Sequence, residues 1–341
     1  MPRCQININI QPFLRGESES GYTNDYRLSL YTMQVHHDIE QLPVFRNAVI
    51  TIGTFDGVHK GHRKILDKMK SEAEATGGET VIITFHPHPR KVVSSEFMGI
   101  RLITTIEERI GLLENLGIDH LVVVPFTDVF ANQSAEEYIR DFLVAKFHPH
   151  TIIIGYDHRF GRDRVGNFQL LEEKSTEYGY RLVEIPKHVL ENISISSTSI
   201  RKAIIHNDTE TVNKVLGYDF FFSGLVVHGN KLGRQLGYPT ANLKVKDEDK
   251  IIPGNGIYAV YAQPEGYNEK LKGMMSIGFR PTVDGKQRVI EVNIFDFDKM
   301  IYDQQLTVFV YKYLRPELKF DGLEALVKQI DQDKINSLAV L

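Results

Sequence analysis

The sequence is nearly free of cysteine, since Cys4 is the only one among its 341 residues. An intrachain disulfide is therefore excluded, which agrees with a reducing compartment. There is also no run of about 18 apolar residues, the length that a membrane helix needs. The N-terminal sequence MPRCQININIQPFLRGESES lacks the charged and then apolar layout of a signal peptide. These absences predict a cytoplasmic protein with no membrane partner.

The chain has no excess of positive charge either. It carries 40 Lys and Arg against 44 Asp and Glu, a net charge of −4. Binding to a nucleic acid needs a basic surface that releases counterions, so we expect no nucleic-acid partner. Small phosphorylated ligands are still allowed, because a few local cations and backbone N–H groups can hold them. For the assembly we expect a monomer or a weak homo-oligomer.

The length suits two domains of ordinary size. Residues 1–32 are polar and have no sustained period, so they predict a poorly ordered extension, or a natural start at Met33. In residues 33–214, short continuous apolar strands alternate with amphipathic helices, which predicts a doubly wound, mostly parallel sheet. One of these helices, residues 134–147, opens with Ser134 and Glu137 in capping-box spacing. Residues 215–341 predict an all-β barrel of short strands with one final amphipathic helix.

The first motif with chemical meaning is GTFDGVHKGHRKIL, residues 53–66, between a strand and a helix. Ligands bind at this end of a parallel sheet, and the helix N-terminus adds N–H donors. His59 and His62, three residues apart, could face one phosphate and stabilise charge that develops on it. Three glycines let the backbone approach that phosphate closely: Gly53, Gly57 and Gly61. The alternative is that both histidines are ordinary turn residues.

A second motif, ISSTSIR, spans residues 195–201. Ser196, Ser197 and Thr198 could cap the following helix or offer hydroxyls to a ligand. Arg201 can hold a phosphate through two parallel hydrogen bonds. By itself the motif would be read as a helix cap.

The third motif, GNKLGRQLGYPTANL, covers residues 229–243 and contains no Walker A loop. Thr240 and Asn242 are two residues apart, so a strand directs both side chains to one face, where their oxygens suit Mg²⁺. Further along, Glu291 lies in the apolar strand VIEVNI. An unpaired buried carboxylate is costly, so a functional role is favoured over an outward-facing strand residue.

Taken together, GTFDGVHKGH and ISSTSIR resemble the two signatures of the nucleotidyltransferase superfamily. More narrowly, they resemble the FMN adenylyltransferase module of prokaryotic bifunctional riboflavin kinase/FAD synthetases. GYPTANL, GFRPTVDG (residues 278–285), VIEVNIFDF and YLRPELKFDGLEALVKQI are similar to the riboflavin kinase domain. The resemblance covers about residues 33–338.

This resemblance implies a Rossmann-like nucleotidyltransferase domain (residues 33–214) and then a six-stranded antiparallel β-barrel with a C-terminal helix (residues 215–341). It implies an enzyme that phosphorylates riboflavin to FMN and adenylylates FMN to FAD, with ATP as co-substrate and Mg²⁺ as cofactor. Two alternatives remain: a nucleotidyltransferase for another phosphorylated cofactor precursor, and a flavin-binding regulator without catalysis.

The resemblance also assigns roles to single residues. The catalytic group that it implies is Glu291 as the base of the kinase, with His59, His62 and Arg201 for adenylyl transfer. The implied ATP contacts are Gly53, Thr54, Phe55, Gly57, Gly61, Ser197, Thr198, Gly229, Lys231, Gly233, Pro239 and Thr240. The implied flavin contacts are Asp157, Arg159, Phe160 and Arg280, and the implied Mg²⁺ ligands are Thr240 and Asn242.

Two positions depart from the family pattern. His86 stands where an acidic residue is common, and His158 where an aromatic residue is common. The pair His86 and His88 suggests a metal site, but prolines flank it and no Cys or Glu partner is near, so nucleotide contact is favoured.

Overall fold

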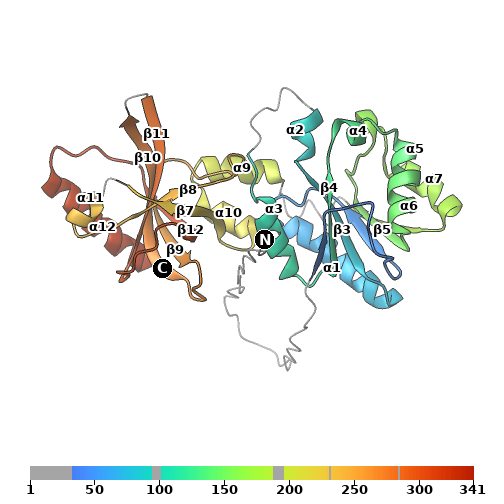
Figure 1. Ribbon diagram of the computed structural model, residues 1–341, viewed down its shortest axis with the longest axis horizontal. Helices are drawn as coiled ribbons and strands as arrows, with labels where there is room; N and C mark the ends of the chain where they lie inside the picture. Colours follow the sequence, from blue (N-terminus) through green and yellow to red (C-terminus); the bar gives the residue numbers. More distant parts are fainter. Residues whose placement is uncertain (1–32, 94–100, 187–195, 230–231, 283–284) are drawn as a thin grey trace. The chain divides into compact units, whose positions relative to one another are not determined.

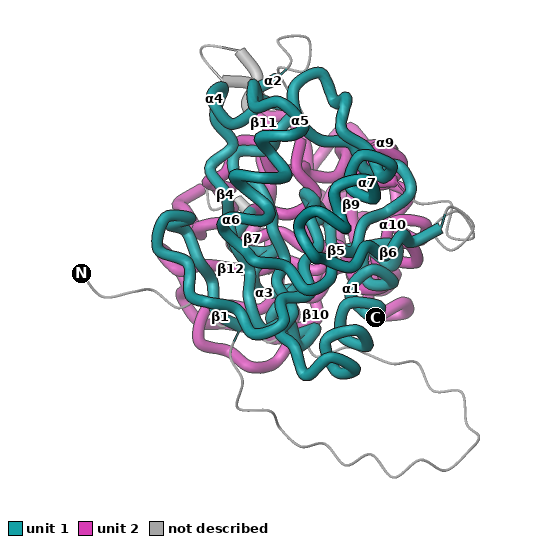
Figure 2. Tube along the Cα trace, turned by 90° about the vertical axis from the view of Figure 1, so that its right-hand side faces the viewer, with its two compact units in different colours: residues 1–100, 106–195 teal, residues 101–105, 196–341 magenta. Residues whose placement is uncertain are grey.

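The computed structural model describes residues 33–93, 101–186, 196–229, 232–282 and 285–341. The expectation for residues 1–32 and the role given to Lys231 lie outside these ranges. The described residues fall into two compact units (Figure 2). Unit 1 takes its residues from 1–100 and 106–195, and unit 2 takes its residues from 101–105 and 196–341. The predicted boundary between the two activities, with one in residues 33–214 and the other in residues 215–341, stays a prediction.

Unit 1 is built on a six-stranded parallel sheet in the order β1-β4-β3-β2-β5-β6. The strands are β1 (Gln34–His36), β2 (Val49–Ile52), β3 (Thr80–His86), β4 (His120–Pro125), β5 (Thr151–Gly155) and β6 (Arg181–Ile185). Every residue of β2 is buried, as expected for a strand that is covered on both faces. The predicted doubly wound sheet is confirmed. The sequence did not predict β1, which is a short, partly exposed edge strand.

Helices connect these strands. They are α1 (Lys60–Thr76), α2 (Pro89–Val93), α3 (Ile106–Glu114), α4 (Asp128–Ala131), α5 (Ala135–Glu137), η2 (Tyr138–Val144), α6 (Ala145–Phe147), η3 (Arg162–Arg164) and α7 (Phe168–Tyr178). Figure 1 shows α5, α6 and α7 gathered on one side of the sheet. On that side Phe142 and Leu171 pack with Ile50, Ile83 and Ile154 of the strands. Because parallel crossovers are right-handed, α1 and α3 cover the opposite face.

The predicted helix over residues 134–147 begins as expected but has a different interior. Ser134 and Glu137 form the capping box. The next seven residues, η2, are a π-helix, in which Ala145 N–H bonds back to Arg140 O. The rings of Tyr138 and Phe142 lie 5.2 Å apart in the aromatic core. Such packing can override the local α-helical preference, and an apolar period cannot reveal this.

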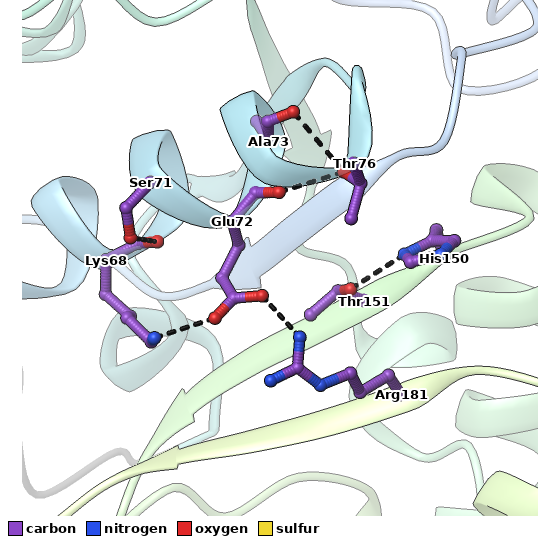
Figure 3. Close-up of polar contacts among 8 residues, drawn as sticks. All are labelled: Lys68, Ser71, Glu72, Ala73, Thr76, His150, Thr151 and Arg181. Carbon is purple, nitrogen blue, oxygen red and sulfur yellow. Dashed lines mark hydrogen bonds and ion pairs between the residues drawn. The ribbon is translucent and has the colours of Figure 1, made fainter.

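An ion-pair cluster joins α1 to β6 inside unit 1 (Figure 3). The Glu72 carboxylate, with 8% of its side chain exposed, accepts from Lys68 Nζ at 2.7 Å and from Arg181 Nη1 at 2.5 Å. Thr76 Oγ1 donates to the Glu72 carbonyl at 2.9 Å in the last turn of α1. The helix is thus fixed at one end to a strand that lies more than 100 residues away in the sequence.

Unit 2 contains a closed antiparallel barrel in the order β10-β11-β8-β7-β12-β9. Its six strands are β7 (Phe220–Val227), β8 (Ala241–Lys244), β9 (Gly256–Pro264), β10 (Leu271–Thr282), β11 (Gly285–Ile294) and β12 (Gln305–Arg315). The predicted barrel with a C-terminal helix is confirmed. The helices of this unit are α9 (Ser197–Ile205), α10 (Thr209–Leu216), α11 (Leu232–Gln235) and α12 (Leu323–Val340).

The last helix is anchored by a buried ion pair. Arg315 on β12 donates to Asp333 of α12 from Nε at 2.7 Å and from Nη2 at 2.5 Å. Tyr261 Oη on β9 donates to the Leu341 carbonyl at 2.8 Å.

No helix within the described ranges is long and apolar enough to cross a membrane.

Candidate functional site

The loop after β2 lies where the sheet topology places a ligand. β2 is central in the sheet, with β3 on one side and β5 on the other, so the strand order reverses beside it. Phe55 and Val58 adopt positive φ values of 46° and 36°, which non-glycine residues rarely do. Such strain persists where surrounding structure enforces it, and it clusters at active sites and ligand clamps.

His59 is the N-cap of α1. Its extended backbone lets the ring Nδ1 accept the His62 backbone N–H at 3.3 Å. The two imidazole rings stack with centroids 3.7 Å apart and planes at 13°. Both predicted histidines therefore lie together at the helix N-terminus. Which ligand they contact stays a prediction.

The electrostatics of His62 favour the neutral ring. Burial lowers the pKa of His62 well below its usual value, and the His59 and Arg109 charges lower it further. Its Nδ1 atom is buried and has no hydrogen-bond partner in the described part of the chain. An unsatisfied buried polar atom costs about 1–3 kcal/mol, which a ligand group could offset.

Arg109 is a residue of this site that the sequence reasoning missed. It lies on α3, is 3% exposed, and donates from Nη1 to Thr84 Oγ1 at 3.2 Å. Thr84 Oγ1 in turn donates to the Thr54 carbonyl of the loop at 3.2 Å. The sequence did contain a signal for Arg109, because an arginine stands among the apolar positions of this helix. Periodicity alone, however, does not reveal which group a buried cation contacts.

The loop after β5 holds the predicted flavin contacts of unit 1. Asp157 and Arg159 are exposed, whereas Phe160 is buried and its ring stacks on Tyr138 at 5.0 Å. The ring of Phe160 is also near that of His158, with their centroids 5.8 Å apart. Burial lowers the pKa of His158 to about 4. Its Nε2 is buried and without a hydrogen-bond partner among the described residues.

His86, the last residue of β3, and His88, two residues later, do not share an environment. His86 is exposed, whereas His88 is 7% exposed and its Nδ1 accepts the Arg90 N–H at 3.2 Å. Within the described ranges, no group of three or more His, Cys, Asp or Glu residues is placed to hold a metal.

Residues 196–201 of the ISSTSIR motif cap and begin α9 in unit 2. Ser196 is its N-cap and forms a reciprocal capping box with Ser199, which confirms a capping role. Arg201, one turn later, donates from Nε to the Arg101 carbonyl at 2.7 Å. Ser197 and Thr198 lie in the first turn. That this motif and the His59 loop bind the same ATP molecule stays a prediction.

A second cluster lies in the barrel. Glu291 on β11 stands directly opposite Asn242 on β8. Thr240 Oγ1 donates to Glu291 Oε1 at 3.3 Å, and Arg280 of β10 donates to Glu291 Oε2 in an ion pair. The Glu291 side chain is 22% exposed, so it is neither a solvated surface residue nor an unpaired buried charge. Four residues that span 51 positions of sequence are thus brought together.

The backbone around this cluster is tight. A Cβ atom at Gly229 would overlap the Asn242 side-chain amide, and one at Gly233 would overlap the Tyr238 carbonyl. Asn293 Nδ2 donates to the Pro239 carbonyl at 2.7 Å and holds the segment before β8. A cavity of about 50 Å³ adjoins Thr240, with basic side chains from Arg234 and Lys299 in its wall.

Known protein families match the two halves in the same order. The family model described as FAD synthetase matches residues 42–199, and the model described as riboflavin kinase matches residues 216–341. A protein of Buchnera aphidicola subsp. Schizaphis graminum, named bifunctional riboflavin kinase/FMN adenylyltransferase, is 39% identical over 84% of this chain and 92% of its own length. A Listeria monocytogenes protein with the same name is 36% identical, over 90% of this chain and 97% of its own.

A solved structure is similar over most of the chain. It is titled as a macrolide-efflux protein from Streptococcus pneumoniae, has a TM-score of 0.79 and 28% identity, and covers 90% of this chain and 98% of its own.

Proposed function

The chain belongs to the bifunctional riboflavin kinase/FMN adenylyltransferase family, and from this membership we propose how its residues divide two successive reactions. The barrel cluster of unit 2 phosphorylates riboflavin to FMN. The His59 loop of unit 1, with the α9 motif, adenylylates FMN to FAD. The chain is an enzyme of flavin coenzyme biosynthesis that uses ATP in both steps.

In the kinase step, the Glu291 carboxylate takes the proton from the terminal ribityl hydroxyl of riboflavin. The hydroxyl oxygen then bonds to the γ-phosphorus of ATP, and the bond from that phosphorus to the bridging oxygen breaks to release ADP. The contacts from Thr240 and Arg280 hold Glu291 in place for this role. The observation that carries the proposal is this set of contacts opposite Asn242.

Magnesium fits the same cluster. Thr240 Oγ1 and the Asn242 side-chain oxygen are hard oxygen donors next to a carboxylate, the donor type that Mg²⁺ prefers. We assign them as its ligands. When bound, the ion supplies positive charge to the phosphates of ATP.

In the adenylyltransferase step, a phosphate oxygen of FMN bonds to the α-phosphorus of ATP and pyrophosphate leaves. The nucleophile is already an anion, so no strong base is required, and positioning with charge stabilisation carries the reaction. A neutral His62 can donate one hydrogen bond to the phosphate, beside the N–H groups at the start of α1. Arg201 and Arg109 supply positive charge.

The test is a chromatographic product assay on the full chain with riboflavin, ATP and Mg²⁺, repeated with FMN in place of riboflavin. We expect FMN and then FAD, with ADP and pyrophosphate as co-products. If FMN is converted but riboflavin is not, the barrel has no kinase function. If neither flavin reacts, the assay is repeated with other phosphorylated cofactor precursors. If none of these reacts either, a non-catalytic flavin-binding regulator becomes the better description.

We place the enzyme in the cytoplasm, as a monomer or weak homo-oligomer whose partners are riboflavin, FMN and ATP. The single cysteine supports the cytoplasmic placement, and the absence of an excess of positive charge argues against a nucleic-acid partner.

A further inference from the structure

A short segment of unit 2, residues 101–105, runs beside the chain just before β9. Leu102 forms a parallel bridge with Lys250. The Ile251 N–H donates to the Leu102 carbonyl at 2.8 Å, and Lys250 Nζ donates to the Ile103 carbonyl at 2.6 Å. These bonds fix the position of Arg101, the residue at the start of the segment. They also hold Lys250 with only 2% of its surface exposed.

Next to this segment is a cavity of about 250 Å³, five times the volume of the cavity beside Thr240. Its wall combines three cationic side chains with three isoleucines: Arg101, Lys250, Arg288, Ile205, Ile251 and Ile252. None of the described residues that line it is acidic. None belongs to the sets that we assign to the two reactions.

The two arginines of the wall are held by neutral oxygens. Arg288 donates from Nη2 to the Pro253 carbonyl and from Nε to Asn255 Oδ1 at 3.3 Å. Arg101 donates to the Glu248 carbonyl. Such bonds fix the direction of a guanidinium but leave its charge in place.

The positive charges of the two arginines in this wall repel each other. Burial lowers the pKa of Arg288, and the positive charge of Arg101 lowers it further, while Tyr258 and Glu317 act in the opposite direction. Two fixed guanidinium groups whose charges repel each other would be stabilised by an anion between them.

We infer that this cavity is a binding site for a small molecule that carries a phosphate group. Guanidinium groups match phosphate oxygens through paired hydrogen bonds, and two of them suit an anion with more than one negative charge. The isoleucines form an apolar wall for the rest of the ligand, and the volume exceeds what a few waters fill.

The site is linked to the adenylyltransferase motif within unit 2. Ile205 is the last residue of α9, and the Arg101 carbonyl accepts from Arg201 on the same helix. A ligand in the cavity would therefore contact the end of the helix whose start carries Ser197 and Thr198.

Calorimetric titration of the full chain tests the inference, with pyrophosphate, inorganic phosphate and ADP as separate probes. EDTA is present to suppress metal-dependent binding at the reaction sites. We expect at least one probe to bind about tenfold more weakly to Arg288→Gln and to Arg101→Gln than to the wild type, since each loses a charge-assisted hydrogen bond. Lys272→Gln, an exposed lysine on the same barrel, is the charge-matched control and should leave the titration unchanged.

The three probes also identify the ligand. Equal affinity for phosphate and pyrophosphate means recognition of one phosphoryl group, tighter pyrophosphate means a diphosphate, and tighter ADP means that the isoleucines hold a nucleoside. The inference is overturned if both arginine variants bind all three probes as the wild type does. Arg101 is exposed, so Arg101→Gln keeps the test valid if circular dichroism shows that Arg288→Gln fails to fold. A crystal soaked in pyrophosphate should show the anion between Arg101 and Arg288, and an anion bound only elsewhere would also overturn the inference.

Discussion

His158 shows what a single ring can do to the response of this enzyme to pH. Its ring lies beside Phe160, its Nε2 is buried, and burial lowers its pKa to about 4. An unfolded chain would protonate the same ring near pH 6.5. Between about pH 6.5 and 4 the unfolded state therefore binds more protons than the folded state. The contribution of the neutral His158 ring to the free energy of unfolding is therefore fully present above pH 6.5. It is lost as the pH falls through that range.

We predict that His158→Phe flattens the pH dependence of stability. The variant removes a contribution of up to about 3 kcal/mol between pH 8 and pH 4, because a phenyl ring has no proton to gain. Urea unfolding of both proteins at several pH values measures this. At pH 8 both rings are neutral, so any difference there reports packing alone. Curves that stay parallel down to pH 4 would show that the ring does not remain neutral in the fold.

The family resemblance predicted much of the barrel site. Thr240, Asn242 and Glu291 were assigned together from the resemblance, and the structure brings them into contact or direct register with one another. The ion pair between Arg280 and Glu291 was not foreseen, because Arg280 was assigned to the flavin. Arg109 was missed altogether. Both depend on long-range contacts, which local patterns do not contain.

At the scale of elements, apolar periodicity correctly gave the parallel sheet with its helices and the barrel with its last helix. It missed β1, which has three residues, and the π-helical turn of η2, which depends on how aromatic side chains pack. It also gave no sign that residues 101–105 would leave their neighbours in the sequence and join unit 2. Each miss is a case in which tertiary packing, rather than local preference, decides the structure.

The attachment of α1 to β6 predicts a stability effect. Glu72→Gln replaces a nearly buried carboxylate that two cations share, so we expect a loss of about 1–3 kcal/mol at pH 7. The hydrogen bond from Lys68, more than the charge of Arg181, lowers the pKa of Glu72 in the fold. Its stabilisation is therefore present above the unfolded pKa and is lost as the pH falls through the folded pKa.

Chemical unfolding followed by circular dichroism at pH 7 and pH 3 measures this effect. The gap between wild type and Glu72→Gln should narrow at the lower pH. Asp67→Gln, also on α1 but with 62% of its side chain exposed, is the control and should change stability little. A gap that is the same at both pH values would argue against an ionic origin.

Because the backbone before β8 is tightly packed, we predict that a substitution there selectively lowers riboflavin phosphorylation. Gly229→Ala places a Cβ against the Asn242 side-chain amide, which must move away from its place opposite Glu291. We expect riboflavin phosphorylation to fall at least about tenfold, because a displaced ligand loosens a site that depends on positioning. Conversion of FMN to FAD should be retained. Gly322→Ala, where a Cβ meets nothing within 4 Å, is the control, and equal kinase rates for both variants would contradict the prediction.

At the scale of the whole molecule, two chemistries on two sets of residues predict opposite defects. Glu291→Gln should lower riboflavin phosphorylation at least about a hundredfold, the usual contribution of a general base, and should spare FMN adenylylation. His62→Ala should do the reverse, since it removes a hydrogen-bond donor at the phosphate. Separate rate measurements with riboflavin and with FMN test both variants. Glu269→Gln, an exposed carboxylate of the barrel, is the control for the first variant.

Loss of both activities in either variant would mean that the two sites are not independent. Equal rates in all three variants and the wild type would remove Glu291 and His62 from the chemistry.

The bridge between Leu102 and Lys250 also limits how this protein can be divided. The chain changes unit three times, so no single cut in the gene yields two complete halves. A fragment that begins at residue 196 lacks the strand partner of Lys250 and the Ile103 carbonyl to which its ammonium donates. Such a fragment would expose a cation that is now 2% exposed, and a peptide spanning residues 101–105, added in trans, is the natural supplement for it.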